Sequence, residues 1–300
     1  MKNTLKAHIA LFLANFFYGI NYIIVKGLMP YYISAPALTF VRIIPTTVLF
    51  WLICSLIKTD KIEKKDFRQL LFAGFFGVFC NQYLFIQGLD YSTPIDAAII
   101  MTTSPILVFI MSAMILKDSV SKIKMTGIII GAAGALILIL GKGFTGFKLQ
   151  HLKGDIMLLL NSISFAVYLL ITRPLMIKYN ALTVLKWVFL IGAIFYFPFG
   201  IIPFSHIVWN NMSPKIILSI AYVVFATTFL TYLLINYSLK LLKSTVVSMY
   251  IYIQPVIAAI VATLIGIDKP TAINISACIL VFVGVYLVSG VNKQIKSLYK

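Results

Sequence analysis

Apolar stretches of about 20 residues follow one another along almost the whole chain, and short polar segments separate them. A helix needs roughly 20 apolar residues to cross about 30 Å of hydrocarbon. By that criterion the pattern predicts an all-α membrane protein with ten transmembrane helices, at residues 7–25, 35–57, 70–89, 95–116, 123–140, 155–176, 181–202, 216–239, 245–267 and 273–290. Several connections are too short to hold a folded domain, so we expect the lipid bilayer to surround nearly the whole chain.

Two stretches of the chain resemble one another at a spacing of 150 residues. Residues 95–140 and 245–290 share three landmarks, which are Pro105 and Pro255 in mid-helix, Asp118 and Asp268 in a short turn, and Gly134 and Gly284 in the following helix. A repeat of this length predicts that one half of the chain is a divergent copy of the other.

The repeat extends to the first helix of each half. At a spacing of 147, Lys26 aligns with Arg173 and Asn21 aligns with Tyr168. We therefore expect two five-helix repeats, at residues 1–146 and 147–300. Because five is an odd number, the second repeat enters the membrane upside down relative to the first. Inverted repeats around a shared site are typical of secondary transporters.

Composition and charge agree with the hydropathy pattern. Hydrophobic residues make up 61% of the 300-residue chain and charged residues 11%, and the mean hydropathy of +1.01 is too high for a water-soluble domain. The net charge of +17 comes from short Lys and Arg clusters between apolar spans, so we expect no nucleic-acid partner. The three cysteines lie far apart inside apolar spans, a spacing that predicts neither a metal site nor a disulfide.

The basic residues also predict how the helices are oriented. If the N-terminus is cytoplasmic, the cytoplasmic segments hold 17 Lys and Arg residues and the external segments hold 6. Arg42 and Lys186 lie within spans or at their ends. Because basic residues favour the cytoplasmic side, this asymmetry predicts a multi-pass protein of the cell (inner) membrane with both termini in the cytoplasm.

The segment LTFVRIIPTTVLF around Arg42, the matched mid-helix prolines and the Gly-rich helix after each short turn carry a family resemblance. In these features the chain is similar to the EamA family of the drug/metabolite transporter superfamily. The resemblance implies transport of small metabolites, often the export of amino acids or related compounds. One departure is the turn after the fourth helix, where many members carry Gly-Glu and this chain has Lys-Asp at 117–118 and Ile-Asp at 267–268.

Polar side chains within apolar spans are candidates for a substrate pathway, because in lipid each must face a partner helix or a water-filled cavity. Asn161, Ser164 and Tyr168, for example, share one helix face by their spacing. The full candidate set is Asn15, Tyr18, Asn21, Arg42, Gln82, Tyr83, Thr103, Asn161, Ser164, Tyr168, Tyr232, Asn236, Tyr250 and Gln254. Hydrogen bonding between helices explains any single member equally well. For the set as a whole we expect a polar central cavity.

Pro105 and Pro255 each remove a backbone donor and clash with the carbonyl four residues earlier. Either proline alone could mark a simple packing kink. Because the two occupy equivalent places in the repeats, we expect them to act as hinges beside the substrate path.

Arg42 lies about two turns into the second predicted helix, and no span has a carboxylate near its middle. Arg42 could bind a substrate carboxylate or phosphate, hold a structural or gating position, or snorkel to the external surface. Proton-coupled carriers usually rely on an intramembrane carboxylate or histidine, and only Asp96 lies close to the expected path. Facilitated exchange is therefore as consistent with the sequence as proton antiport.

The sequence argues against most other classes of function. It lacks the paired catalytic groups of an intramembrane enzyme, and it has no Walker loop, so we expect neither enzyme activity nor a cofactor. A GxGxxG match at residues 141–146 follows a membrane helix rather than a strand, so we interpret it as a linker. We expect a secondary transporter that exports small molecules such as amino acids or related compounds by alternating access. An organic anion or sugar-phosphate exchanger, a channel, and a homodimer remain open.

Overall fold

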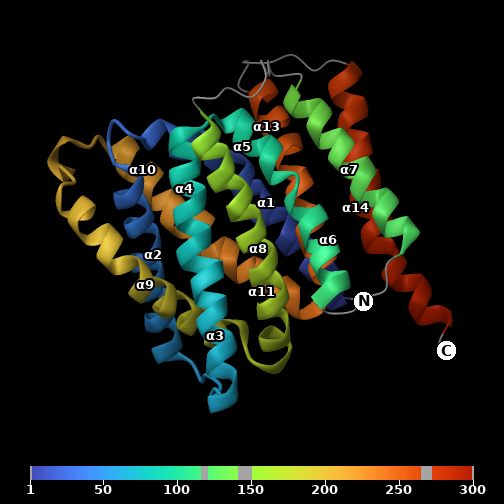
Figure 1. Ribbon diagram of the computed structural model, residues 1–300, viewed down its shortest axis with the longest axis horizontal. Helices are drawn as coiled ribbons and strands as arrows, with labels where there is room; N and C mark the ends of the chain where they lie inside the picture. Colours follow the sequence, from blue (N-terminus) through green and yellow to red (C-terminus); the bar gives the residue numbers. More distant parts are fainter. Residues whose placement is uncertain (1, 116–120, 141–150, 265–271, 299–300) are drawn as a thin grey trace.

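The computed structural model describes residues 2–115, 121–140, 151–264 and 272–298, and almost all of them are helical (Figure 1). No strand occurs in these ranges, so the expected all-α class is confirmed. The elements of the first half are α1 (Lys2–Leu28), α2 (Ala35–Leu56), η1 (Lys64–Asp66), α3 (Phe67–Gly74), η2 (Phe75–Cys80), α4 (Asn81–Tyr91), α5 (Pro94–Met101), α6 (Ser104–Ile115) and α7 (Lys122–Leu140).

The second half runs through a closely similar series of elements. They are α8 (Leu152–Lys178), α9 (Ala181–Ser205), η4 (Trp209–Asn211), α10 (Pro214–Val224), η5 (Phe225–Leu230), α11 (Thr231–Leu241), α12 (Ser244–Met249), η6 (Tyr250–Tyr252), α13 (Ile253–Leu264) and α14 (Ala272–Leu298). The turn residues Asp118 and Asp268, the expected linker at 141–146 and the expected boundary between repeats at 146/147 lie outside the described residues.

Eight helical stretches in the described residues are long and apolar enough to cross a membrane. They are Asn3–Leu28, Ala35–Leu56, Lys64–Tyr91, Pro94–Ile115, Leu152–Lys178, Ala181–Ser205, Pro214–Leu241 and Ser244–Val261. The other two spans expected from the sequence coincide with α7 and with α14, which contains the shorter apolar stretch Ile275–Ser289. The chain is therefore a multi-pass membrane protein.

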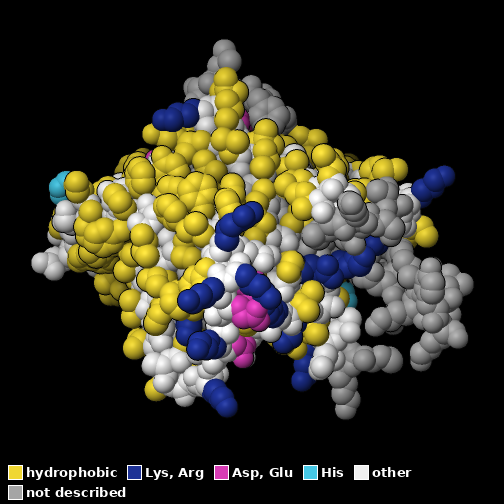
Figure 2. Space-filling view, turned by 60° about the horizontal axis from the view of Figure 1, so that its bottom comes forward, with side chains coloured by type: hydrophobic (Ala, Val, Ile, Leu, Met, Phe, Trp, Pro, Cys, Tyr) yellow, Lys and Arg dark blue, Asp and Glu magenta, His cyan; other side chains and the backbone are white. Residues whose placement is uncertain are grey.

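The surface of the molecule is divided by polarity. Large hydrophobic side chains such as Leu56, Leu218 and Tyr286 are exposed along the helices, as expected where lipid is the solvent. In Figure 1, α1 begins and α14 ends in the lower half of the view, where the connection from α2 to α3 also lies. Figure 2 turns this side forward and shows Lys and Arg side chains gathered there, with hydrophobic surface around them.

Several pairs of elements in the two halves keep the spacing of 150 residues. Helix α8 begins 150 residues after α1 (residues 2 and 152), and both helices have 27 residues. The π-helical turn η2 recurs as η5 at the same spacing (residues 75 and 225), and α4 recurs as α11 (residues 81 and 231). For the first helices this register pairs Tyr18 with Tyr168, not Asn21 with Tyr168 as the 147-residue spacing suggested. The three-residue difference is close to one helical turn, so both registers bring similar faces together.

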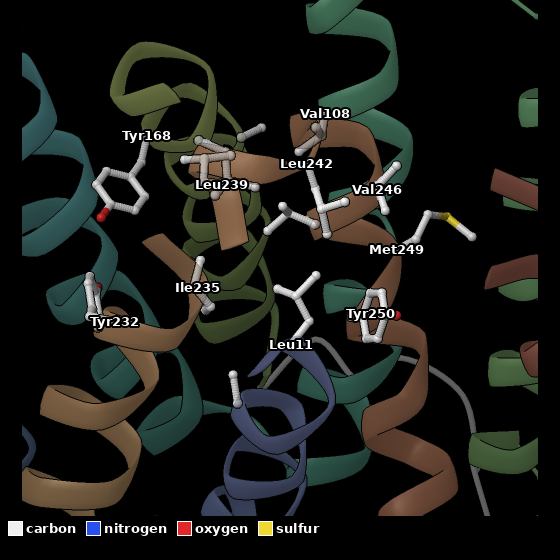
Figure 3. Packing of buried hydrophobic residues seen from close by; sticks show 14 of the residues in the cluster. Leu11, Val108, Tyr168, Tyr232, Ile235, Leu239, Leu242, Val246, Met249 and Tyr250 are labelled. Atoms are coloured by element: carbon white, nitrogen blue, oxygen red, sulfur yellow. The ribbon is translucent and has the colours of Figure 1, made fainter. Parts of the chain in front are cut away.

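The largest buried hydrophobic cluster joins helices from the two halves. In Figure 3, Leu11 of α1 lies close to Ile235 of α11 and to the side chains of α12, and Val108 of α6 lies above them. Because lipid tails are as apolar as these side chains, close packing rather than escape from water stabilises such contacts. The cluster fixes α1, α6, α11 and α12 around the centre of the bundle.

Candidate functional site

A cavity with a volume of about 70 Å³ lies at this centre and is lined by helices from both halves. Its polar lining is Asn15, Asn21, Arg42, Asn81, Gln82, Ser104, Asn161 and Gln254. Its aromatic and apolar lining is Tyr18, Tyr22, Phe85, Met101, Phe165, Ile235, Val247 and Ile251. A volume of this size has room for roughly five water molecules or a small polar group.

The structure places half of the candidate residues on this cavity. They are Asn15, Tyr18, Asn21, Arg42, Gln82, Asn161 and Gln254. The other seven, which are Tyr83, Thr103, Ser164, Tyr168, Tyr232, Asn236 and Tyr250, do not belong to its lining. The hydrogen bonds and ring contacts of the second group show what most of those side chains do instead.

One wall of the cavity is a pair of amides contributed by the two halves. The Gln254 Nε2 of α13 donates to the Asn15 Oδ1 of α1 at 2.8 Å, and Asn15 in turn donates to the Leu11 carbonyl at 2.8 Å. The Tyr22 hydroxyl donates to Gln254 Oε1 at 3.2 Å. These bonds fix the two amides, so the wall is built before any ligand arrives.

The π-helical turn η2 directly precedes Asn81 and Gln82, the α4 residues that line the cavity. A π-helical turn is wider than an α-helical one and leaves carbonyl groups for other partners. Ser164 of α8 donates to the Phe76 carbonyl at 2.7 Å, and Tyr232 of α11 donates to the Gly77 carbonyl at 2.6 Å. Asn161 donates to the Asn81 carbonyl at 2.7 Å. The polar groups of Ser164 and Tyr232 therefore hold helices together.

Tyr232 is also the centre of a chain of side-chain hydrogen bonds. Its hydroxyl accepts from Gln82 Nε2 at 3.1 Å, and the two residues are 150 positions apart, so they are equivalents in the two halves. Asn236 donates to the Tyr168 hydroxyl at 2.7 Å, and the Tyr168 ring lies against Gly77. This network positions Gln82 at the edge of the cavity.

The second π-helical turn, η5, satisfies its carbonyls internally. The hydroxyls of Thr227 and Thr228 donate to the Val223 carbonyl, and the hydroxyl of Thr231 donates to the Ala226 carbonyl, each at 2.8 Å. Thr228 also accepts from Arg42 Nε at 3.1 Å. The turn thus anchors the one charged side chain in the described lining of the cavity.

Arg42 is buried, with 2% of its surface exposed. That burial argues against snorkelling to the external surface, one of the three roles left open by the sequence. Its Nη1 is buried without a hydrogen-bond partner, and no ion pair found among the described residues includes it. The guanidinium group is therefore held at one nitrogen and unpaired at another.

The two matched prolines lie where the long helices are interrupted. Helix α5 ends at Met101 and α6 begins at Ser104, so Pro105 is the second residue of a new helix instead of a mid-helix residue. In the second half, the 3-10 turn η6 separates α12 from α13, which contains Pro255. The Thr103 hydroxyl donates to the Ile100 carbonyl at 2.7 Å within the first interruption.

Tyr83 and Tyr250 make contacts between helices. Tyr83 contacts Phe79 and Tyr196 in an aromatic cluster between α4 and α9. The hydroxyl of Tyr250 is 2.6 Å from His8 Nδ1, near the start of α1. The Tyr83 ring and the Tyr250 hydroxyl therefore serve contacts between helices rather than the cavity.

The sequence and the fold of this chain are similar to those of known proteins. The sequence matches the EamA-like transporter family over residues 5–140 and again over residues 152–290. The chain belongs to this family. The resemblance noted from the sequence is thereby confirmed, and the protein is a membrane transporter.

Several relatives of this EamA-like transporter cover most of its length. The uncharacterized transporter YyaM of Bacillus subtilis (strain 168) is 26% identical over 241 residues, which are 79% of this chain and 79% of YyaM. An uncharacterized transporter of Archaeoglobus fulgidus is 25% identical over 284 residues, 95% of this chain and 99% of that protein. A crystal structure with 16% sequence identity covers 97% of both chains with a TM-score of 0.74, which shows a shared fold.

Part of the transporter's site could not be found from the sequence. The apolar lining residues Phe85, Phe165 and Ile251 resemble the lipid-facing residues of the same helices, so composition does not separate them. Ser104 precedes Pro105 directly and faces the cavity, whereas the neighbouring Thr103 does not. The signal that could have identified Ser104 is its place at the interruption between α5 and α6.

The transporter has a second polar cluster, between the ends of α1, α4 and α5 and the start of α8. Lys26 Nζ donates to the carbonyls of Leu89, Asp90 and Ser92 at 2.8–2.9 Å, capping the end of α4. Asp96, the titrating group noted in the sequence, lies 3.2 Å from His151 Nδ1. The Lys26 bonds lie within the first half, and the contact between Asp96 and His151 joins the two halves away from the central cavity.

Proposed function

We propose that this protein is a secondary transporter that works by alternating access and exports amino acids or related small metabolites. The observation that carries the proposal is a polar cavity enclosed by helices of two halves whose elements repeat at a spacing of 150 residues. In a bundle of this kind, exchanging the conformations of the two halves exchanges the side on which the cavity opens.

The proposal assigns ten spans to the chain, as two inverted five-helix repeats at residues 1–146 and 147–300. The eight long apolar helices, together with α7 and α14, support that number. The cytoplasmic side is the one with the basic clusters, so both termini are cytoplasmic and the host membrane is the cell (inner) membrane.

Movement is assigned to the two helix interruptions next to Pro105 and Pro255. Each adjoins a cavity residue, Ser104 in the first half and Gln254 in the second. An interruption breaks the backbone hydrogen-bond ladder, so the two parts of each helix can change their angle at a lower cost than a continuous helix.

Counterflow in proteoliposomes tests the proposal. Vesicles preloaded with an unlabelled amino acid should accumulate the labelled one transiently, and the initial rate should saturate with concentration. A channel gives neither saturation at low concentration nor counterflow, so a linear flux without counterflow would reject alternating access. Imposing a pH gradient separates proton antiport from facilitated exchange, which the sequence leaves equally open.

One observation favours a second candidate, an organic anion or sugar-phosphate exchanger. The charged residue in the described lining of the cavity is a cation, Arg42, and no carboxylate lies beside it. The same counterflow measurement with sugar phosphates in place of amino acids tests this candidate.

A further inference from the structure

The central cavity contains a buried cation that has no counter-ion in the described part of the chain. Arg42 is anchored by Nε to Thr228, whereas Nη1 is buried without a partner. The described lining includes no Asp or Glu. A buried charge without a partner strongly destabilises a protein, because the lost hydration is not replaced. A residue kept in that state indicates that the compensating charge comes from outside the chain.

Two more unpaired polar atoms line the same cavity. Asn21 Oδ1 and Ser104 Oγ are buried and have no hydrogen-bond partner. Other amides of the lining are paired, since Asn15 bonds to Gln254 and Asn161 bonds to a backbone carbonyl. Unpaired buried polar groups are uncommon in native proteins, and three on one cavity point to a polar ligand.

The single guanidinium group of the cavity favours a carboxylate over a phosphate as its ligand. A guanidinium group presents planar, paired donors that match the two oxygens of a carboxylate. One carboxylate neutralises one guanidinium. A phosphate monoester carries a charge of about −1.5 to −2 at neutral pH and would leave negative charge uncompensated in a buried cavity.

The cavity adjoins an apolar space. A second cavity of about 190 Å³ shares Tyr22, Met101, Ile251 and Gln254 with the first and is otherwise lined mainly by apolar side chains of α1, α5 and α13. A ligand whose charged end lies at Arg42 can therefore extend an apolar part past Met101 and Ile251.

We propose that Arg42 binds the carboxylate of a small substrate that carries a single carboxylate and an apolar side chain. The inference rests on the proposed transport function and specifies how that site recognises its substrate. It selects carboxylates over phosphates, and acids over the matched amides, which lack the carboxylate charge.

The first test compares acids with their amides on the purified full-length protein. Thermal unfolding is followed with L-leucine, L-phenylalanine and 4-methylpentanoate, with the matched amides, and with inorganic phosphate and glucose 6-phosphate. At least one of the acids should raise the unfolding midpoint, and its amide should require a concentration at least ~10-fold higher for the same rise, because one charge-assisted bidentate contact is lost. Equal stabilisation by acid and amide, stabilisation by the phosphates alone, or no effect of any acid overturns the proposal.

The second test uses variants of Arg42. Arg42→Gln should abolish the difference between acid and amide, and Arg42→Lys should retain part of it, because the charge remains while the paired donors are lost. Arg68→Gln changes an exposed arginine of α3 and should behave as wild type. An unchanged preference for the acid in Arg42→Gln would remove Arg42 from the site. If that variant does not fold, the comparison of acids and amides on the wild-type protein decides whether the site recognises a carboxylate.

The binding and counterflow measurements can fail separately. Arg42-dependent binding of an acid without counterflow would reject the transport mechanism and keep the carboxylate site. Counterflow of amino acids that is unchanged in Arg42→Gln would keep the mechanism and reject the site.

Discussion

Arg42 and Tyr232 are both polar residues buried in apolar helices, yet their surroundings differ completely. Tyr232 donates to the Gly77 carbonyl and accepts from Gln82, so it joins α11 to the helical stretch Lys64–Tyr91. Arg42 faces the cavity with Nη1 unpaired. The sequence could identify both residues as candidates, because either role requires a polar atom in an apolar span. It could not distinguish them, because the distinction depends on which carbonyl lies opposite each side chain.

Replacing the buried cation should stabilise the empty protein. Arg42→Met removes an uncompensated charge and keeps most of the side-chain volume, so the free energy of unfolding without ligand should rise by roughly 1–3 kcal/mol. Thermal unfolding in detergent measures the change, with Arg68→Met as the exposed control. A clear loss of stability in Arg42→Met would mean that the guanidinium group holds the helices together.

Gly77 should be intolerant of even one methyl group. A Cβ at this position would overlap the Tyr168 ring, and overpacking of this kind costs about 1–3 kcal/mol. Gly27, near the end of α1, has no atom within 4 Å of the same added Cβ. Unfolding midpoints should therefore fall for Gly77→Ala and stay unchanged or rise slightly for Gly27→Ala. Equal behaviour of the two variants would contradict the observed packing of Tyr168 on η2.

At the scale of helices, the apolar pattern predicted the positions of the eight long apolar helices, because the length of a span is set by the hydrocarbon thickness. The π-helical turns η2 and η5 were not predicted. A π-helical turn adds one residue to the helix ladder without changing its hydropathy, so no periodicity reveals it. The proline positions were visible, but a helix interruption and a kink within a continuous helix have the same sequence signature.

The contact between α7 and α14 should depend on glycine. A Cβ on Gly284 would lie 2.6 Å from the Gly127 carbonyl oxygen and 2.6 Å from the Gly131 nitrogen, both of which are backbone atoms that cannot rotate away. Gly284→Ala should therefore separate the two helices and lower the unfolding midpoint. Ala133→Val, on the exposed side of α7, is the matched control and should have little effect. A wild-type midpoint for Gly284→Ala would show that the helices can shift apart at no cost.

At the scale of the whole molecule, the hydrogen bonds between helices that build the cavity join the two halves. Asn15 pairs with Gln254 across them, and Gln82 pairs with Tyr232. The repeat could be recognised from the sequence because prolines and glycines mark it. The alignment of the first helix of one half with the first helix of the other could be established only from the structure, because so few identities remain there.

Labelling of engineered cysteines should find the connection after α2 and the end of α11 on the same side of the membrane. In a variant without the three native cysteines, Lys61→Cys and Lys240→Cys should react with a membrane-impermeant maleimide only after the cells are opened. Lys215→Cys, at the start of α10, should react in intact cells. Labelling of position 61 and position 240 from opposite sides would contradict the assigned number of spans.

The duplication also determines how much charge the centre can contain. The described lining of the cavity takes Arg42 from the first half and no charged side chain from the second. Two identical half-length chains would have brought two guanidinium groups to one small space, where they would repel each other and attract dianions. Two halves fused into one polypeptide can differ in sequence, so that a single positive charge faces the cavity and matches a single carboxylate.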